Sequence, residues 1–244
     1  MFKQPHAPQY STQDQLVWKV LFDRQTALLH RRAVPAFAQG LAQLGLRRET
    51  IPDLEALSAQ VAARTGWQLV PGARQVGLTA FFALLAERKF PVVTRMRSMS
   101  EFDFSPQPDL FHDVFGHVPL LLDEAFADFL HALGKAAQPL SATDPAAWRQ
   151  LWALYFFTAE FGLVLHHGQP RLYGAGLLSS AGEIHHCISE QTPRPAFDLA
   201  TVLRTPVRDT RFQEQYFVLP DWSQLSASVS ELALLMSGEW CIAA

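Results

Sequence analysis

The segment SPQPDLFHDVFGHVPLL, residues 105–121, carries two histidines in a largely apolar stretch, His112 and His117. On an uninterrupted α-helix, a step of five residues places the second side chain about 140° around the axis, so the two imidazoles would not share a face. Gly116 and Pro119 can bend the chain here and bring both histidines to one cleft. Histidine is a common metal ligand and also a common structural residue, so the spacing alone leaves both possibilities open.

Glu160 favours the metal site. It lies in the apolar run 151–165, where only Trp152, Tyr155 and Thr158 carry other polar groups. We expect this carboxylate to be buried, and it must then be protonated, paired with a cation or bound to a metal. Two histidines and one carboxylate form the facial triad that leaves open positions on Fe(II) for oxygen chemistry. A salt bridge from Glu160 to an arginine is the alternative.

The rest of the chain predicts helices joined by short loops. The expected helices begin at Thr12 with a capping box to Gln15, span about 34–44, follow Pro52 as far as Gly66, run over 79–89 from a Thr79 cap, cover 146–167, and span 221–236 from an Asp221 cap. The β-branched segment FPVVTRMR, residues 90–97, predicts a short strand. The predicted fold is therefore mainly α with a small β component. We expect a single domain over 1–244, with a core at about 10–220 and a final helix at about 221–236, because 244 residues are few for two cores.

Composition narrows the class of partner. The net charge of -3 is spread without long runs of one sign, which argues against nucleic acid and anionic membranes as partners. Two cysteines without a paired motif argue against a disulfide scaffold or a structural zinc site. The first residues lack a signal peptide pattern, and no apolar run reaches the roughly 20 residues of a membrane span. We expect a cytoplasmic monomer that binds a small molecule.

Other polar residues near these segments have structural explanations as well. Ser180 and Glu183 form an S-x-x-E pattern that predicts a capping box. Asp109 and Asp113 can simply occupy the first turn of a helix, where the helix dipole favours acids. Arg97 is either a solvated surface residue or a clamp for a carboxylate.

Three motifs resemble the pterin-dependent aromatic amino acid hydroxylases, the family of the phenylalanine, tyrosine and tryptophan hydroxylases. The motifs are PDLFHDVFGHVPLL at 108–121, LYFFTAEFGL at 154–163 and YGAGLLSSAGE at 173–183. Shorter similarities extend the resemblance over nearly the whole chain, namely IPDLEAL at 51–57, TGWQLVPG at 65–72 and QYFV at 215–218. The resemblance implies a monooxygenase that uses Fe(II), a tetrahydropterin such as tetrahydrobiopterin, and O2 to hydroxylate the ring of a free aromatic amino acid.

The resemblance also implies roles for single residues. The iron ligands would be His112, His117 and Glu160. The pterin would stack on Phe81 and lie near Val76, Leu78, Asp113 and Tyr155. The amino acid's carboxylate would be held by Arg97, and Asp109 would be the acid that orients it. The same end of the pocket would be lined by Gly176, Ser179 and Ser180, and the aromatic ring would be surrounded by Pro108, Phe156 and Val218.

Two positions depart from the family pattern. Phenylalanine hydroxylases usually carry Trp at the position of Phe156, whereas tryptophan hydroxylases carry Phe there, so we expect tryptophan as the substrate and phenylalanine as the alternative. Gln107 stands where an acid is usual, which puts a salt bridge of the family in doubt. The resemblance is to a bacterial form, so we expect the catalytic domain alone, without the regulatory domain and tetramerising helix of animal members.

Two other classes of protein are alternatives to a hydroxylase. A zinc hydrolase with the same three ligands would need a general base beside the metal, and the HExxH spacing that provides one is absent. A binding protein that has kept the fold and lost the chemistry would not need to retain all three ligands together with Arg97.

Overall fold

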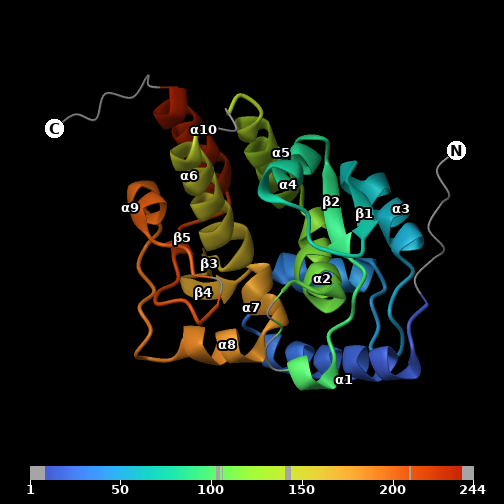
Figure 1. Cartoon of the computed structure of the whole chain (residues 1–244). Coiled ribbons are helices and arrows are strands. Elements are labelled where there is room, and N and C mark those ends of the chain that lie inside the picture. Colours follow the sequence, from blue (N-terminus) through green and yellow to red (C-terminus); the bar gives the residue numbers. More distant parts are fainter. Residues whose placement is uncertain (1–8, 103–104, 106, 141–143, 209, 238–244) are drawn as a thin grey trace, which may run out of the picture.

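The computed structural model describes residues 9–102, 105, 107–140, 144–208 and 210–237, and most of them lie in helices (Figure 1). The α-helices are α1 Thr12–Leu29, α2 Pro35–Gln43, α3 Leu54–Thr65, α4 Leu78–Ala86, α5 Glu124–Ala137, α6 Pro145–Tyr155, α7 Ala175–Ser179, α8 Ala181–Ile188, α9 Leu199–Arg204 and α10 Ser223–Ser237. Two 3-10 helices are η1 Met99–Glu101 and η3 Val118–Leu122, and two π-helices are η2 His112–His117 and η4 Phe156–Glu160. The strands are β1 Gln68–Gly72, β2 Lys89–Val93, β3 Leu163–His166, β4 Gln169–Leu172 and β5 Val218–Leu219.

The strands form two small sheets. β1 and β2 pair in parallel, and β3 lies between an antiparallel β4 and a parallel β5. The prediction of a mainly helical fold with a small β component is therefore confirmed. Within the described residues, no helix is both long and apolar enough to cross a membrane.

The predicted start of α1 at Thr12 is confirmed, but the predicted capping box was wrong by one residue. The N-cap is Ser11, whose hydroxyl accepts a hydrogen bond from the Asp14 amide at 3.2 Å, while the Asp14 carboxylate accepts from the Ser11 amide at 2.8 Å. Gln15 instead accepts a hydrogen bond from the Ile51 amide at 2.9 Å. Both pairs, Thr12 with Gln15 and Ser11 with Asp14, have the spacing of a capping box. The Ser11 pair is the one observed because its carboxylate is charged and lies near the positive end of the helix dipole.

The expected helix over 146–167 is divided into three parts. α6 ends at Tyr155, the π-helix η4 follows, and β3 begins at Leu163. The predicted Thr79 cap is also wrong, because α4 begins at Leu78 after Gly77 and no side chain caps it. An apolar run does not distinguish a buried helix from a buried strand, and for this reason the helix predicted over residues 163–166 was wrong.

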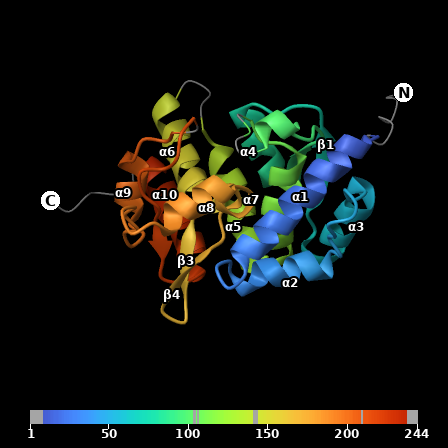
Figure 2. The same ribbon diagram turned by 90° about the horizontal axis from the view of Figure 1, so that it is seen from below.

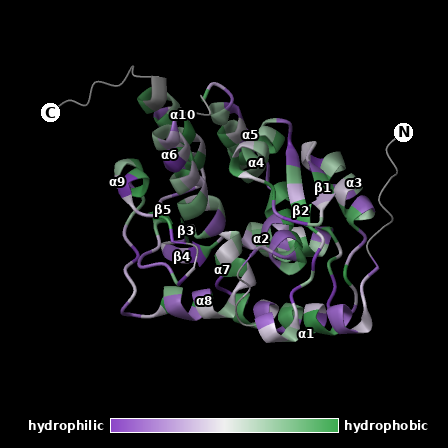
Figure 3. Cartoon of the chain, in the orientation of Figure 1, coloured by the Kyte–Doolittle hydropathy of each residue, from purple (hydrophilic) through white to green (hydrophobic). Residues whose placement is uncertain are grey.

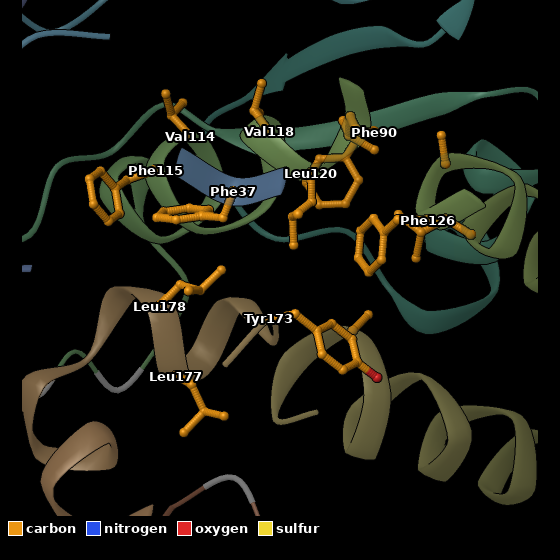
Figure 4. Close-up of a cluster of buried hydrophobic side chains, with 14 of the residues drawn as sticks. Phe37, Phe90, Val114, Phe115, Val118, Leu120, Phe126, Tyr173, Leu177 and Leu178 are labelled. Carbon is orange, nitrogen blue, oxygen red and sulfur yellow. The ribbon is translucent and has the colours of Figure 1, made fainter. Parts of the chain in front are cut away.

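The core surrounds the helix that carries the two histidines. Figure 4 shows Phe37, Phe115, Phe126 and Tyr173 within one cluster of buried side chains. Phe115 of η2 packs against Phe37 of α2 with ring centroids 5.5 Å apart. Val114 beside it is fully buried as well, so the apolar residues of η2 fix the position of this short helix.

Helix α1 supports the site from below. Seen from below, it crosses the molecule toward α7 and α8 (Figure 2), and apolar and polar turns follow one another along it (Figure 3). Gln25 of α1 is fully buried and donates a hydrogen bond to the Leu178 carbonyl of α7 at 2.9 Å. This contact holds the helix that ends at Ser179.

Candidate active site

His112 and His117 are the first and last residues of the π-helix η2. The Val118 amide donates to the Asp113 carbonyl, which is an i to i+5 step. This wider turn brings residues five apart back toward one face, and the imidazole centroids lie 5.0 Å apart. The prediction that the two histidines share a cleft is confirmed, but the predicted bend at Gly116 and Pro119 is wrong.

Gly116 has a packing role instead. A Cβ atom at Gly116 would lie 3.0 Å from the Ala175 carbonyl oxygen, so the absence of a side chain allows α7 to approach η2 closely. Pro119 lies in the first turn of the following 3-10 helix, where a missing amide hydrogen costs nothing.

Glu160 ends the second π-helix, η4, where the Phe161 amide donates to the Phe156 carbonyl at 3.0 Å. Its Oε1 lies 3.1 Å from His117 Nε2, and its Oε2 lies 3.4 Å from His112 Nε2. Two ligands at right angles on a cation with bonds of about 2.1 Å are about 3 Å apart, so the three groups fit a shared metal ion. The alternative of a salt bridge from Glu160 to an arginine finds no support among the described ion pairs.

Ser179 determines which nitrogen of His112 is free. The Ser179 hydroxyl donates its one hydrogen to the Ala175 carbonyl at 2.8 Å, and its oxygen lies 2.9 Å from His112 Nδ1. The oxygen must therefore accept the Nδ1 hydrogen. With the hydrogen of neutral His112 held on Nδ1, the lone pair of Nε2 would be available to a metal ion between His112 and Glu160.

Asp113 is a competing candidate for the third ligand, since its carboxylate and the two histidines offer ligand atoms within 4.8 Å of one another. However, the Val93 amide already donates to Asp113 Oδ2 at 2.6 Å, and burial raises the pKa of Asp113 to about 7. Glu160 differs: burial alone would raise its pKa, but its interactions with His117 and His112, hydrogen bonds among them, hold that pKa well below the usual range. An ionised carboxylate that faces both imidazoles is the better ligand.

Tyr155 connects the metal-binding residues to an aromatic wall. Its hydroxyl donates to Glu160 Oε1 at 2.9 Å, and its ring meets Phe81 edge-on with centroids 5.0 Å apart. Burial and the nearby charge of Glu160 raise the pKa of Tyr155 well above its ordinary value. Tyr155 therefore stays protonated and orients the Glu160 carboxylate.

Two cavities open on the candidate metal ligands. The larger, of about 430 Å³, includes His112, His117 and Glu160 in its wall, together with the predicted pterin-binding residues Val76, Leu78, Phe81, Asp113 and Tyr155. The aromatic rings that contact Phe81 within the described residues are tilted from it by 74° to 80°. None of these rings stacks parallel to Phe81.

The smaller cavity, of about 220 Å³, is lined by the predicted substrate-binding residues Arg97, Pro108, Phe156, Gly176, Ser179 and Ser180. A Cβ atom at Gly176 would lie 2.6 Å from the Phe161 ring, so a larger residue would push that ring aside. Asp109 does not line the cavity but binds Arg97 from behind, with Nε to Oδ2 and Nη2 to Oδ1 distances of 2.8 Å. Arg97 is thus a buried, oriented cation and not a surface residue.

Val218 is the predicted site residue that the structure places elsewhere. It is buried in β5, opposite Leu163 of β3, and lines neither cavity. The S-x-x-E capping box is also only half present: Ser180 accepts from the Glu183 amide at 3.3 Å, but the Glu183 carboxylate accepts a hydrogen bond from Tyr216. The motifs that contain Val218 and Glu183 did not predict which residues these two side chains contact.

Several residues that line the two cavities were not predicted from the sequence. Trp152 lines both cavities, and Glu183 and Arg211 line the smaller one. The position of Trp152 one helical turn before Phe156 was a usable signal. Arg211 lies in a segment without regular structure, and no pattern pointed to it.

Comparisons with known proteins agree with this geometry. The sequence profile described as biopterin-dependent aromatic amino acid hydroxylase matches residues 4–242. A phenylalanine-4-hydroxylase of Ralstonia nicotianae is 41% identical over 217 residues, which cover 88% of this chain and 69% of the relative.

Two solved structures are similar over nearly all of the chain. A phenylalanine hydroxylase of Chromobacterium violaceum, solved with iron(III) and 7,8-dihydrobiopterin, has a TM-score of 0.87 at 38% identity, covering 94% of this chain and 84% of the other. A phenylalanine hydroxylase of Legionella pneumophila has a TM-score of 0.88 at 36% identity, covering 98% of this chain and 96% of the other. These matches set the hydrolase alternative aside. The chain belongs to the biopterin-dependent aromatic amino acid hydroxylases.

Proposed function

We propose that this protein hydroxylates L-phenylalanine to tyrosine with Fe(II), a tetrahydropterin and O2. The observation that carries the proposal is the convergence of His112, His117 and Glu160 where two cavities meet. Such an arrangement allows two different molecules to approach one metal ion. When bound, iron and pterin together activate O2, which supplies the oxygen atom for the ring.

The chain's own residues hold the metal ion and keep its ligands in the required state. His112 and His117 bind as neutral imidazoles, and Glu160 binds as a carboxylate. Ser179 keeps the Nε2 lone pair of His112 free, and Tyr155 fixes the Glu160 oxygen from the side. Such supporting hydrogen bonds orient metal ligands and tune their basicity.

The larger cavity accommodates the pterin. Phe81 offers a ring face on which no other described ring is stacked, and the backbone around Val76 and Leu78, which line the same cavity, would be the polar partner of the pterin. Asp113, with its pKa raised to about 7 by burial, can offer a proton as well as an acceptor to the pterin's ring nitrogens.

The smaller cavity accommodates the amino acid. Arg97 binds the carboxylate with the Nη1 side of its guanidinium, because Asp109 already occupies Nε and one hydrogen of Nη2. Pro108 and Phe156 would flank the ring, and Gly176 and Ser180 line the same cavity. Holding the ring beside the metal ion decides which carbon reacts, and the enclosing walls exclude water.

Phenylalanine is the better supported substrate. The relatives reported above carry the name of phenylalanine hydroxylases, whereas the expectation of tryptophan rested on Phe156 alone. Phe156 still favours tryptophan as a second candidate, since a phenyl group fills less of the pocket wall than an indole. Its ring packs against Phe161 with centroids 4.7 Å apart.

The test is a product analysis. The Fe(II)-loaded protein is incubated with tetrahydrobiopterin, O2 and either phenylalanine or tryptophan, and the products are identified by mass spectrometry. Tyrosine as the main product, dependent on both iron and pterin, is expected. A hydroxytryptophan as the main product would replace the assignment with the second candidate, and no hydroxylated product from either amino acid would overturn both.

A further inference from the structure

The wall between the two cavities contains residues to which neither the motifs nor the proposed function assigns a role. The residues that line both cavities are Gln75, Pro108, His112, Trp152 and Glu160. His112 and Glu160 are the candidate metal ligands, and Gln75 is largely exposed. Trp152 is the large aromatic member of this shared wall.

The contacts of Trp152 place its indole at the junction. It stacks nearly parallel on Tyr155, with centroids 5.3 Å apart and an angle of 22° between the rings. It also contacts Phe156, with ring centroids 6.0 Å apart and an angle of 49° between the rings. Tyr155 lines only the larger cavity and Phe156 only the smaller one.

The helix holds the indole at this position. Trp152 and Phe156 are four residues apart and therefore neighbours along one side of the helix that α6 begins. Ala153 and Leu154, next to Trp152, are buried in the core, so this stretch of helix cannot turn to move the indole away. Trp152 itself is only partly buried and keeps part of its surface toward the cavities.

We infer that Trp152 is a specificity-determining residue that contacts both the bound pterin and the ring of the bound amino acid. Its indole lies one helical turn from Phe156 and supplies bulk to the pocket wall that the smaller phenyl of Phe156 does not. The size of the amino-acid pocket is therefore set by Trp152 and Phe156 together. The part of this inference that concerns the amino acid rests on the proposed function.

Trp152 should differ from its neighbours on the helix in which ligands its loss affects. Loss of the Trp152 indole opens the wall between the cavities, so it weakens binding of the pterin and of phenylalanine, and it makes room for a bicyclic ring. Loss of the Phe156 ring affects the amino acid alone. Trp148, one turn earlier on α6, packs against Phe82 and lines neither cavity, which makes it a matched control.

The experiment compares Trp152→Ala, Trp152→Phe and Trp148→Phe with the unmodified protein. Calorimetric titration with 7,8-dihydrobiopterin measures pterin binding without turnover, and kcat/KM is measured for phenylalanine and for tryptophan. Trp152→Ala should raise the Kd for the pterin several-fold and shift the tryptophan-to-phenylalanine ratio of kcat/KM by about 10-fold or more toward tryptophan. Trp152→Phe should move both values in the same direction by less, and Trp148→Phe should move neither.

Unchanged pterin binding in Trp152→Ala, or an equal change in Trp148→Phe, overturns the inference. A pterin effect without a shift in the substrate ratio overturns the shared role. If Trp152→Ala does not fold, Trp152→Phe alone decides, because its smaller ring must still alter both values. If the unmodified protein hydroxylates neither amino acid, the proposed function fails, while the pterin titration still decides whether Trp152 lines the pterin site.

Discussion

Arg97 and Asp109 form a buried ion pair in which three hydrogen bonds join the two residues. The Arg97 Nε and Nη2 groups donate to the two carboxylate oxygens at 2.8 Å, and the Arg97 backbone amide donates to Oδ2 at 3.0 Å. Asp109 also accepts from the His112 amide at 3.0 Å. Burial alone would raise the pKa of Asp109, but the hydrogen bonds and charge of Arg97 lower it. The carboxylate therefore fixes the guanidinium and the start of η2 at once.

Replacing Arg97 with lysine should raise the amino acid KM by about 10- to 100-fold, because an ammonium cannot reproduce the paired hydrogen bonds of a guanidinium, and each bond to a charged group contributes about 1.5 to 3 kcal/mol. The control is phenethylamine, which lacks the carboxylate and should be affected little. Steady-state kinetics measures both. Equal losses for the two compounds would remove Arg97 from the carboxylate site.

Replacing Glu160 with glutamine should abolish retention of iron and hydroxylation while leaving the fold intact, because the amide has the same shape without the ligand charge. Iron content after dialysis and the far-UV circular dichroism spectrum measure the two effects. Asp113→Asn is the matched control and should retain iron, since Asp113 Oδ2 is engaged by the Val93 amide. Loss of iron in Asp113→Asn with retention in Glu160→Gln would exchange the ligand roles of the two acids.

Replacing Phe81 with alanine should raise the pterin KM by about 2- to 12-fold, the range that corresponds to about 0.5 to 1.5 kcal/mol for an aromatic pair. The amino acid KM should change little, because Phe81 lines only the larger cavity. Kinetics with each substrate varied in turn measures both constants. A defect confined to the amino acid would show that the pterin does not bind here.

Replacing Phe156 with tryptophan should shift the kcat/KM ratio toward phenylalanine and away from tryptophan. The added ring fills space in the smaller cavity, and differences of this size correspond to about 1 to 3 kcal/mol, or about 10- to 200-fold. Competition between the two amino acids, followed by mass spectrometry of the products, measures the ratio directly. An unchanged ratio would mean that Phe156 does not limit the ring pocket.

The Glu183 carboxyl should make the protein less stable as the pH rises. Burial raises the pKa of Glu183 from its ordinary 4.5 to about 7, although the hydrogen bond from Tyr216 lowers it. Between these values the folded protein keeps a proton that the unfolded chain has lost, so the free energy of unfolding falls with pH, by up to about 3 kcal/mol in total.

Glu183→Gln removes this titration. The difference in free energy of unfolding between the variant and the unmodified protein, measured by urea denaturation, should increase in favour of the variant between pH 5 and pH 8. Asp113 titrates in the same range, but it is present in both proteins and cancels in the difference. A difference that does not depend on pH would show that Glu183 is ionised throughout this range.

Much of the site could be predicted from the sequence because its chemistry is carried by residue types in unusual surroundings. A carboxylate buried in an apolar run must be protonated, paired with a cation or bound to a metal, and two histidines in another apolar segment can supply the remaining ligands of a metal site. The helical character of the chain followed from apolar periodicity, which is a local property. These conclusions about His112, His117 and Glu160 required no knowledge of which elements meet.

The tertiary structure decided what depends on neighbours distant in sequence. Only the fold shows that Ser179 sets the tautomer of His112, that Tyr216 and not a capping box engages Glu183, and that Val218 lies outside both cavities. The two π-helices could not be predicted from the sequence either. A π turn and an α turn differ only by one residue in the hydrogen-bond spacing, and the apolar pattern does not distinguish them. The sequence by itself determined which groups must find partners, and packing between η2, η4, α6 and α7 determined which partners they found.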